Sequence, residues 1–278
     1  MDDASSMTAQ VAEKNRDVWS GTAAVEHFAR INGFIDAGER NAFLSVAPRV
    51  RGQAALDVGV GAGRTVPLVR LFTDDYIAFD YAQGMVEGCR RNYPGVDVRL
   101  ADARNMVEFH DGQFGFVLFS FSGIDALEHH DRGKVLSEMH RVLRPGGWMM
   151  FSTHNMDGPS YGEVPWRGRP SSGPAPYRAF RWIARAPLRV GRYRRSWMNW
   201  LKNRRLNVKG DGWGMHVSSP HEFGIVLHYV TLRALVDEVS KAGFTAIEVY
   251  GSNGARLEPG ADTSRLDAFY VVAQREPA

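Results

Sequence analysis

The stretch "AALDVGVGAGR", residues 54–64, places three glycines within five positions directly behind an apolar run. An apolar run that stops at glycines is typical of a buried strand that turns sharply toward a helix. Glycine adopts positive φ angles at little cost and lets a ligand approach the backbone closely. Gly59, Gly61 and Gly63 therefore predict a strand–turn–helix unit whose turn binds a ligand.

The spacing of these glycines, G-x-G-x-G, narrows the kind of ligand. A dinucleotide-binding turn has the spacing G-x-G-x-x-G, and its third glycine would fall on Arg64, which would crowd a pyrophosphate. A P-loop ends in Gly-Lys followed by Ser or Thr, which this turn lacks. We therefore expect a ligand without a diphosphate in the loop, and Asp57 adds a carboxylate that can hold a cation or an ammonium group.

Outside this turn, short apolar runs alternate with helical stretches. Near-continuous apolar strands that alternate with helices indicate a parallel sheet covered on both faces. We therefore predict a doubly wound, Rossmann-like α/β sheet, preceded by two or three amphipathic helices within residues 5–46. Strands are expected at 54–60, 76–80, 96–102, 114–121, 148–153, 244–251 and 269–275, and helices at about 63–72, 82–92, 132–143 and 231–243, with "RPGG" (144–147) ending a helix.

Two more carboxylates follow the next two predicted strands. Asp80 ends the second strand, where an acid accepts hydrogen bonds from ribose hydroxyls in doubly wound folds. Asp102 ends the third strand, where it can accept a hydrogen bond from an exocyclic adenine amine. Each acid alone is also typical of a helix cap or a loop. Together with the glycine loop, at the carboxyl ends of adjacent strands, they favour a nucleoside site.

This set of motifs resembles the class I S-adenosylmethionine-dependent methyltransferases. The matching pieces are "LDVGVGAGR", "AFDYAQGMVEGCRRN", "LADARNM", "FGFVLFSFSGIDAL" and "MHRVLRPGGWMMFSTHN", in the family's order over about residues 54–155. The resemblance implies a seven-stranded sheet whose last strand is antiparallel, and S-adenosylmethionine as the cofactor. This cofactor carries no phosphate, which agrees with the missing pyrophosphate fingerprint.

The resemblance also implies a cofactor role for individual residues. The family often has a glutamate where Asp57 stands, which is a minor change. The implied set is Asp57, Gly59, Gly61 and Gly63 for the methionine end, Asp80 for the ribose, Asp102 with Ala103 for the adenine, and also Tyr81 and Ser120.

Methyl transfer from an activated cofactor depends on orientation and desolvation, and a base is needed mainly for a hydroxyl or an acidic carbon nucleophile. The segment "SFSGIDALEHH", residues 120–130, should face the methyl group. In the family that the sequence resembles, "LEHH" is commonly a helix start, so His129 and His130 have a structural alternative. The candidate bases are Asp125, His129, His130 and His154, and the weaker candidates are His216, His221 and His228.

Missing motifs narrow the chemistry further. No "NPPY"-type motif follows "VLFSF", which disfavours methylation of nucleic-acid bases. No HxxxH or CxxC spacing occurs, so no metal is expected. We therefore expect methyl transfer to oxygen or nitrogen of a small molecule, such as a sugar or a specialised metabolite. A lipid-linked or nucleic-acid acceptor is the alternative, and the oligomeric state stays open.

A strongly basic segment interrupts the predicted core. Residues 164–213 hold 13 arginines and lysines and one acid, Asp211, so this window carries +12 and the rest of the chain −9. Cations are expected on one face of two helical runs, with Tyr193, Trp197, Trp200 and Leu201 opposite them in the second run and a break at Pro187. Four interpretations stay open: a lid with solvated arginines, a site for an anionic small molecule, a membrane surface contact, and, least favoured, nucleic-acid binding.

Length and composition set the remaining expectations. The 278 residues are 44% hydrophobic, which is enough to fill a core, and the single cysteine, Cys89, suits a reducing compartment. "MDDASSMTAQ" is not a signal peptide, and no apolar run approaches the roughly 18 residues of a spanning helix, so we expect a soluble cytoplasmic protein. The expected regions are a helical cap (1–50), a cofactor-binding core (51–155), a basic insertion (156–229) and the C-terminal part of the core (230–278).

Overall fold

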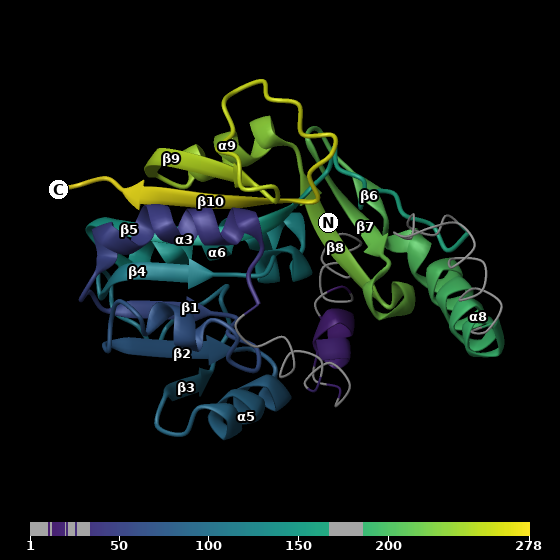
Figure 1. The fold of residues 1–278 in the computed structure, drawn as a ribbon, viewed down its shortest axis with the longest axis horizontal. Coiled ribbons are helices and arrows are strands. Elements are labelled where there is room, and N and C mark those ends of the chain that lie inside the picture. Colours follow the sequence, from purple (N-terminus) through teal and green to yellow (C-terminus); the bar gives the residue numbers. More distant parts are fainter. Residues whose placement is uncertain (1–10, 12, 20, 22–25, 27–33, 167–185) are drawn as a thin grey trace.

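One mixed β-sheet of ten strands organises the chain, and the computed structural model in Figure 1 describes residues 11, 13–19, 21, 26, 34–166 and 186–278. The strands are β1 (Ala55–Val58), β2 (Tyr76–Asp80), β3 (Asp97–Leu100), β4 (Phe114–Phe119), β5 (Leu143–Asn155), β6 (Val208–Lys209), β7 (Trp213–Ser218), β8 (Ile225–Val230), β9 (Phe244–Gly251) and β10 (Ala268–Arg275). The helices are α3 (Ala37–Val50), α4 (Val66–Val69), α5 (Gln83–Asn92), α6 (His129–Val142), α8 (Ala186–Asn203) and α9 (Leu232–Lys241), with short 3₁₀ turns η1 (Gly123–Ala126), η2 (Arg204–Leu206) and η3 (Pro220–Phe223).

Strand order confirms the predicted doubly wound α/β architecture. β1 lies between β2 and β4, β3 pairs with β2, β5 pairs with β4, and all of these pairs are parallel. β10 runs antiparallel to both β5 and β9, as the family resemblance implied for the last strand. The carboxyl ends of β1, β2 and β4 therefore meet at one edge of the sheet, on the side of the molecule that holds β6–β8 and α8 (Figure 1).

Three strands that we did not expect extend this sheet. β8 joins the carboxyl end of β5 in parallel, where His154 pairs with Tyr229, and β7 and β6 follow it as antiparallel neighbours. The seven expected strands form only part of a sheet of ten, because the apolar run 225–230 belongs to the sheet and not to a separate lid. Most of the first predicted basic helix lies outside the described residues. α8 begins at Ala186, so Pro187 stands in the first turn, where proline is tolerated.

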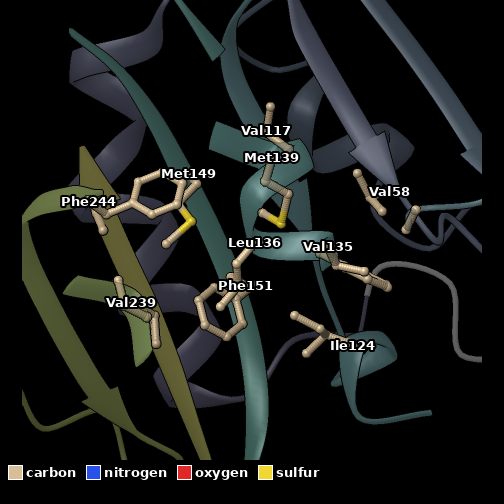
Figure 2. Packing of buried hydrophobic residues seen from close by; sticks show 14 of the residues in the cluster. Val58, Val117, Ile124, Val135, Leu136, Met139, Met149, Phe151, Val239 and Phe244 are labelled. Carbon is tan, nitrogen blue, oxygen red and sulfur yellow. The ribbon is translucent and has the colours of Figure 1, made fainter. Parts of the chain in front are cut away.

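Side chains alternate between two cores, one on each face of the sheet. In β1, Leu56 and Val58 point to the face covered by α6 and α9, whereas Ala55 points to the face covered by α3, α4 and α5. The same alternation holds in β4 and β10, as expected for the two-residue period of a strand. Figure 2 shows the first core, where Leu136 of α6 lies beside Phe151 of β5. Burial of both faces is what keeps the strand ends in register around the site.

Two local predictions were wrong in detail. The helix expected at 63–72 covers only Val66–Val69, because Gly63 adopts a φ of +98° and holds the preceding residues in turns. "RPGG" does not separate a helix from a strand, since residues 144–147 already belong to β5. Within the described ranges, none of the helices is long and apolar enough to cross a membrane.

Candidate active site

A cavity opens where the carboxyl ends of β1, β2, β3 and β4 meet. It is lined by Gly59 after β1, Tyr81 after β2, Asp102 and Ala103 after β3, and Phe119 at the end of β4. Four of the nine predicted cofactor residues therefore line one space. A larger cavity lies between α9, β9 and the connection 252–267, but no predicted site residue lines it. We therefore take the smaller cavity as the candidate cofactor site.

The glycine loop approaches its neighbours too closely for any side chain. A Cβ on Gly59, whose φ is +65°, would lie 2.5 Å from the ring of Phe119. A Cβ on Gly63 would lie 2.6 Å from the ring of Tyr93. Gly61 has a φ of +58°, and its N–H donates a hydrogen bond of 2.9 Å to Asp80 Oδ2. The loop therefore lies against the second strand in a positive-φ conformation that glycine adopts at little cost.

Asp80 and Asp57 are buried acids without a cationic partner. Asp80 accepts hydrogen bonds from the N–H groups of Gly61 and Ala82, one on each oxygen. Asp57 Oδ2 accepts hydrogen bonds from Thr65 at 2.5 Å and from Tyr76 at 2.8 Å, while its Oδ1 has no hydrogen-bond partner. Burial raises the pKa of each carboxyl to about 6. Among the described residues neither acid forms an ion pair, so the site has an excess of negative charge when both are ionised.

Asp102 differs from these two acids. Arg104 binds both of its oxygens, with an Nη2–Oδ2 distance of 2.6 Å, and Arg104 also pairs with Asp131 at 2.8 Å. Burial favours a higher pKa for Asp102, but the hydrogen bonds from Arg104 outweigh it and lower the pKa. Asp102 therefore lines the cavity together with Arg104, which already neutralises its negative charge. Its role toward an adenine amine stays a prediction.

Ser120 lies in a buried network that sequence reasoning did not foresee. Its hydroxyl bonds to Glu39 of α3 and accepts a hydrogen bond of 2.6 Å from Arg64. Arg64 forms a two-pronged ion pair with Glu39, with distances of 2.7 and 2.8 Å, and its guanidinium lies over the ring of Phe121. Arg64 therefore joins the glycine loop to α3 instead of pointing at a ligand. A cofactor role for Ser120 stays a prediction.

Asp125 and His154 form a hydrogen-bonded pair at the turn η1, part of which lines the cavity, although neither side chain is itself in the lining. Asp125 lies in η1, whose neighbouring residues Gly123 and Ala126 line the cavity, and it is fully buried. Its Oδ2 accepts hydrogen bonds of 2.6 Å from both the backbone N–H and the ring Nδ1 of His154. A carboxylate only accepts, so in the neutral form of the ring the Nδ1 atom carries the proton and Nε2 keeps its lone pair. The His154 side chain is 25% exposed, so substrates can reach it.

Two buried neighbours hold Asp125 in place. Arg132 donates a hydrogen bond of 2.5 Å to Asp125 Oδ1, and Thr153 donates one of 2.7 Å to the same oxygen. Arg132 also binds Glu238 of α9 at 2.9 Å. We did not identify Arg132 or Thr153 from the sequence. Arg132 stood in a stretch typical of an exposed helix, and its second partner is 106 residues away.

The other predicted histidines do not join this pair. His129 stacks on Trp213 with ring centroids 3.9 Å apart, and its Nδ1 lies 3.0 Å from Nε2 of His228. Burial lowers the pKa of His228 well below its usual value and also lowers that of His129. His130 forms no hydrogen bond or ion pair with any residue that the structure describes. His216 bonds to a backbone carbonyl, and the side chain of His221 lies outside the described residues.

The turn between β4 and η1 is strained. Phe121 and Ser122 adopt backbone φ angles of 54° and 55°, which residues other than glycine rarely adopt. The Ser122 N–H donates a hydrogen bond of 2.7 Å to Ser152 Oγ on β5, which helps to hold this conformation. The strain brings η1, and with it Asp125, back toward the end of β5. Such strain often accompanies functional sites.

An N-terminal segment covers the cavity. Residues 11 and 13–19 are helical, and Asn15 donates hydrogen bonds of 2.8 Å to the carbonyls of Ala126 and Val226. The guanidinium of Arg16 lies 5.5 Å from the ring centre of Tyr81 and lines the cavity. This segment therefore connects the cofactor side of the site with β8.

Known proteins share this core. A family model described as "Methyltransferase domain" matches residues 55–147. A probable S-adenosylmethionine-dependent methyltransferase of Mycolicibacterium smegmatis is 32% identical over 114 residues, 41% of this chain and 42% of that protein. A demethylmenaquinone methyltransferase of Clavibacter sepedonicus is 35% identical over 115 residues, 39% of this chain and 45% of that protein. The match thus spans less than half the length of these relatives.

A solved structure shows the same fold over most of the chain. The 1,6-didemethyltoxoflavin-N1-methyltransferase of Burkholderia thailandensis, crystallised with 1,6-didemethyltoxoflavin and S-adenosylhomocysteine, superposes with a TM-score of 0.51 at 14% identity, over 86% of this chain and 78% of that one. The fold, the glycine loop and the family match agree with one another. Residues 55–147 of this chain therefore match a methyltransferase domain, and the similarity to S-adenosylmethionine-dependent methyltransferases lies in this core.

Proposed function

We propose that this chain transfers a methyl group from S-adenosylmethionine to an oxygen or nitrogen atom of a small molecule, with His154 as the general base for a hydroxyl acceptor. The observation that carries the proposal is the 2.6 Å hydrogen bond between Asp125 and His154 Nδ1 at the turn η1, part of which lines the cavity. A histidine oriented by a buried carboxylate is a common arrangement for proton abstraction.

The charge of the crevice fits this cofactor. S-adenosylmethionine supplies an activated methyl group on a positively charged sulfur, and it also carries an ammonium group. Asp57 and Asp80 are buried carboxylates without an ion-pair partner among the described residues, and Asp57 Oδ1 lacks any hydrogen bond. A buried charge is stabilised by an opposite charge. We assign Asp80 to the ribose hydroxyls, the glycine loop with Asp57 to the methionine end, and Tyr81, Asp102 and Ala103 to the adenine side.

Asp125 determines what His154 can do. By accepting the Nδ1 hydrogen bond, Asp125 selects the tautomer whose Nε2 is free to take a proton from an acceptor hydroxyl. Positive charge that develops on the imidazole is stabilised by the same carboxylate. Arg132 and Thr153 keep that carboxylate from rotating. An amine acceptor that is already neutral needs this base much less, because orientation alone can drive the transfer.

The test is the release of S-adenosylhomocysteine in the presence of a panel of hydroxylated and aminated small molecules. With a hydroxyl acceptor, His154→Gln should reduce turnover by about 10²–10⁴-fold and leave the affinity for S-adenosylhomocysteine within about twofold. His110→Gln, at an exposed histidine that is not part of the cavity lining, is the matched control and should behave as the wild type.

The outcomes separate two failures. If His154→Gln turns over as fast as the wild type, the base assignment is wrong although methyl transfer stands. If wild-type protein binds no S-adenosylhomocysteine by calorimetry, the proposed activity itself is wrong. We substitute His154 and not Asp125 because removing Asp125 leaves the fully buried Arg132 with one fewer anion and costs stability as well.

A further inference from the structure

Helix α8 lies at the periphery of the molecule, beyond β6 and β7 (Figure 1). One face of α8 is attached to the sheet extension. Asn199 donates a hydrogen bond of 3.0 Å to the carbonyl of Glu222, and Asn203 donates one of 2.9 Å to the carbonyl of Phe223. Trp200 packs against a small buried cluster that includes Val217 and Phe223. Among the residues that the structure describes, the sheet extension contacts only this face of α8, and the opposite face carries exposed side chains.

That outer face carries an exposed apolar strip. Tyr193, Trp197 and Leu201 stand four residues apart, so they share one side of the helix. Their exposed fractions are 50%, 38% and 44%, and neighbouring Met198 is 56% exposed. Trp166 extends the strip, since its ring lies 5.4 Å from that of Trp197. We call Trp166, Tyr193, Trp197, Met198 and Leu201 the apolar strip. An apolar patch of this kind on a surface helix marks an interaction site.

Cations without acidic partners border the strip. Arg194, Lys202 and Arg205 are exposed and form no ion pair or hydrogen bond within the ranges that the structure describes. Lys14 lies close to Lys202 and Arg205. Its pKa is lowered mainly by burial and further by repulsion from these two cations. Arg192 and Arg195, by contrast, share one acid, Glu222. The uncompensated cations favour an anionic partner.

The form of the strip favours a lipid surface over a nucleic acid. Nucleic-acid bases stack on flat aromatic faces. The ring of Trp166 instead meets those of Trp197 and Trp200 at steep angles of 57° and 83°, whereas Trp197 lies at 35° to Trp200 and at 24° to Tyr193. Met198 and Leu201 add aliphatic surface that suits acyl chains. Tryptophan and tyrosine beside aliphatic side chains, with cations around them, are typical of helices that lie in the headgroup layer.

We propose that the outer face of α8 binds the surface of an anionic phospholipid membrane. The apolar strip enters the headgroup layer, and Arg194, Lys202 and Arg205 pair with lipid phosphates. The carboxyl ends of β2 and β4 point toward the half of the molecule that holds α8 (Figure 1). Membrane binding therefore holds the cavity near acceptors that reside at the lipid surface. The binding itself does not depend on the proposed methyl transfer.

The test is co-sedimentation of the full chain with phosphatidylcholine vesicles that contain or lack phosphatidylglycerol. Binding should require phosphatidylglycerol and weaken with salt. Replacing Arg194, Lys202 and Arg205 together with glutamine should weaken it about 100-fold, since each cation near an anionic surface contributes about 1 kcal/mol. Glutamines at Arg40, Arg51 and Arg91, three exposed arginines elsewhere, are the control with the same charge loss and should bind as the wild type.

A second variant tests the apolar strip. Trp197→Ser combined with Leu201→Ser should reduce binding by at least tenfold, and phosphatidylglycerol vesicles should shift the tryptophan fluorescence of the wild type to shorter wavelength but not that of this variant. An unchanged circular dichroism spectrum shows that each variant is folded. Wild-type protein that ignores phosphatidylglycerol vesicles, or binds RNA or DNA in a gel shift while ignoring them, overturns the proposal. Equal vesicle binding by the wild type and the three-glutamine variant overturns it as well.

Discussion

At the scale of single residues, the two buried carboxylates link cofactor binding to pH. Asp57 and Asp80 have pKa values raised to about 6 by burial. In the folded protein each therefore binds more protons than in the unfolded chain between about pH 4 and about pH 6. As the pH rises through that window, ionisation of these two carboxyls lowers the free energy of unfolding. A positively charged ligand reverses this cost, because it favours the ionised forms.

The resulting prediction concerns the affinity for S-adenosylmethionine. It should fall by about tenfold per carboxylate as the pH drops from about 7 to about 5, because protonation removes the attraction of Asp57 for the cationic methionine end and weakens Asp80 as an acceptor for the ribose hydroxyls. S-adenosylhomocysteine has a neutral sulfur and should show a weaker pH dependence. Calorimetry at several pH values measures both.

Asp80→Asn is the matching variant. It should bind both ligands about 1–3 kcal/mol more weakly, because polar groups of the ligand lose an acceptor. Relative to this variant, the wild type should lose thermal stability as the pH rises from about 4 to about 6. Equal pH dependence of the two melting curves would show that Asp80 does not titrate in this range.

Individual residues also show which parts of the candidate site could be predicted from the sequence and which could not. Asp125 and His154 were both candidates because each follows a strand, and the parallel pairing of β4 with β5 brings them together. The sequence alone did not distinguish His154 from the other candidate bases, which were Asp125, His129 and His130. That choice depends on a strained turn at Phe121 and on Arg132, whose contacts with Asp125 and Glu238 join segments far apart in the chain.

At the scale of elements, the N-terminal segment connects both halves of the site. Asn15 donates to the carbonyls of Ala126 and Val226 and accepts a hydrogen bond from the Val226 N–H at 3.2 Å. Arg16, next to it, lines the cofactor cavity. The segment thus lies over the cavity and is held there by one fully buried side chain.

We therefore expect Asn15→Ala to speed cofactor release. Losing the hydrogen bonds of a buried amide costs about 1–3 kcal/mol, so dissociation of S-adenosylhomocysteine should accelerate about 10-fold in stopped-flow experiments. Glu13→Gln, an exposed change on the same segment, should leave the rate unchanged. Equal dissociation rates for Asn15→Ala and the wild type would show that the segment does not retain the cofactor.

Some elements were predictable and others were not. The β1–β5 strands, β9, β10, α5, α6 and α9 follow from apolar runs and helical spacing, because both faces of the sheet are buried. β6 has only two residues. β7 mixes buried with partly exposed positions, and its sequence, WGMHVS, includes a glycine and a histidine. Neither pattern is stronger than that of a loop, so β6, β7 and the direct pairing of β8 with β5 could be found only from the structure.

At the scale of the whole molecule, one sheet carries two kinds of surface. Its parallel strands end in the cofactor cavity, and its extension through β8, β7 and β6 supports α8 with its basic and apolar outer face. Charge asymmetry was evident in the sequence. The way α8 attaches to the sheet, and hence which side chains stay exposed, depends on backbone contacts at Glu222 and Phe223 that no local pattern encodes.

The most direct test of the account is a crystal structure of the full chain with S-adenosylhomocysteine. The account predicts the ligand in the cavity at the ends of β1, β2 and β4, with its ribose hydroxyls on Asp80 and its sulfur facing the space beside His154 Nε2. A ligand whose sulfur points away from His154, or one that binds in the cavity between α9 and β9, would contradict the proposed site.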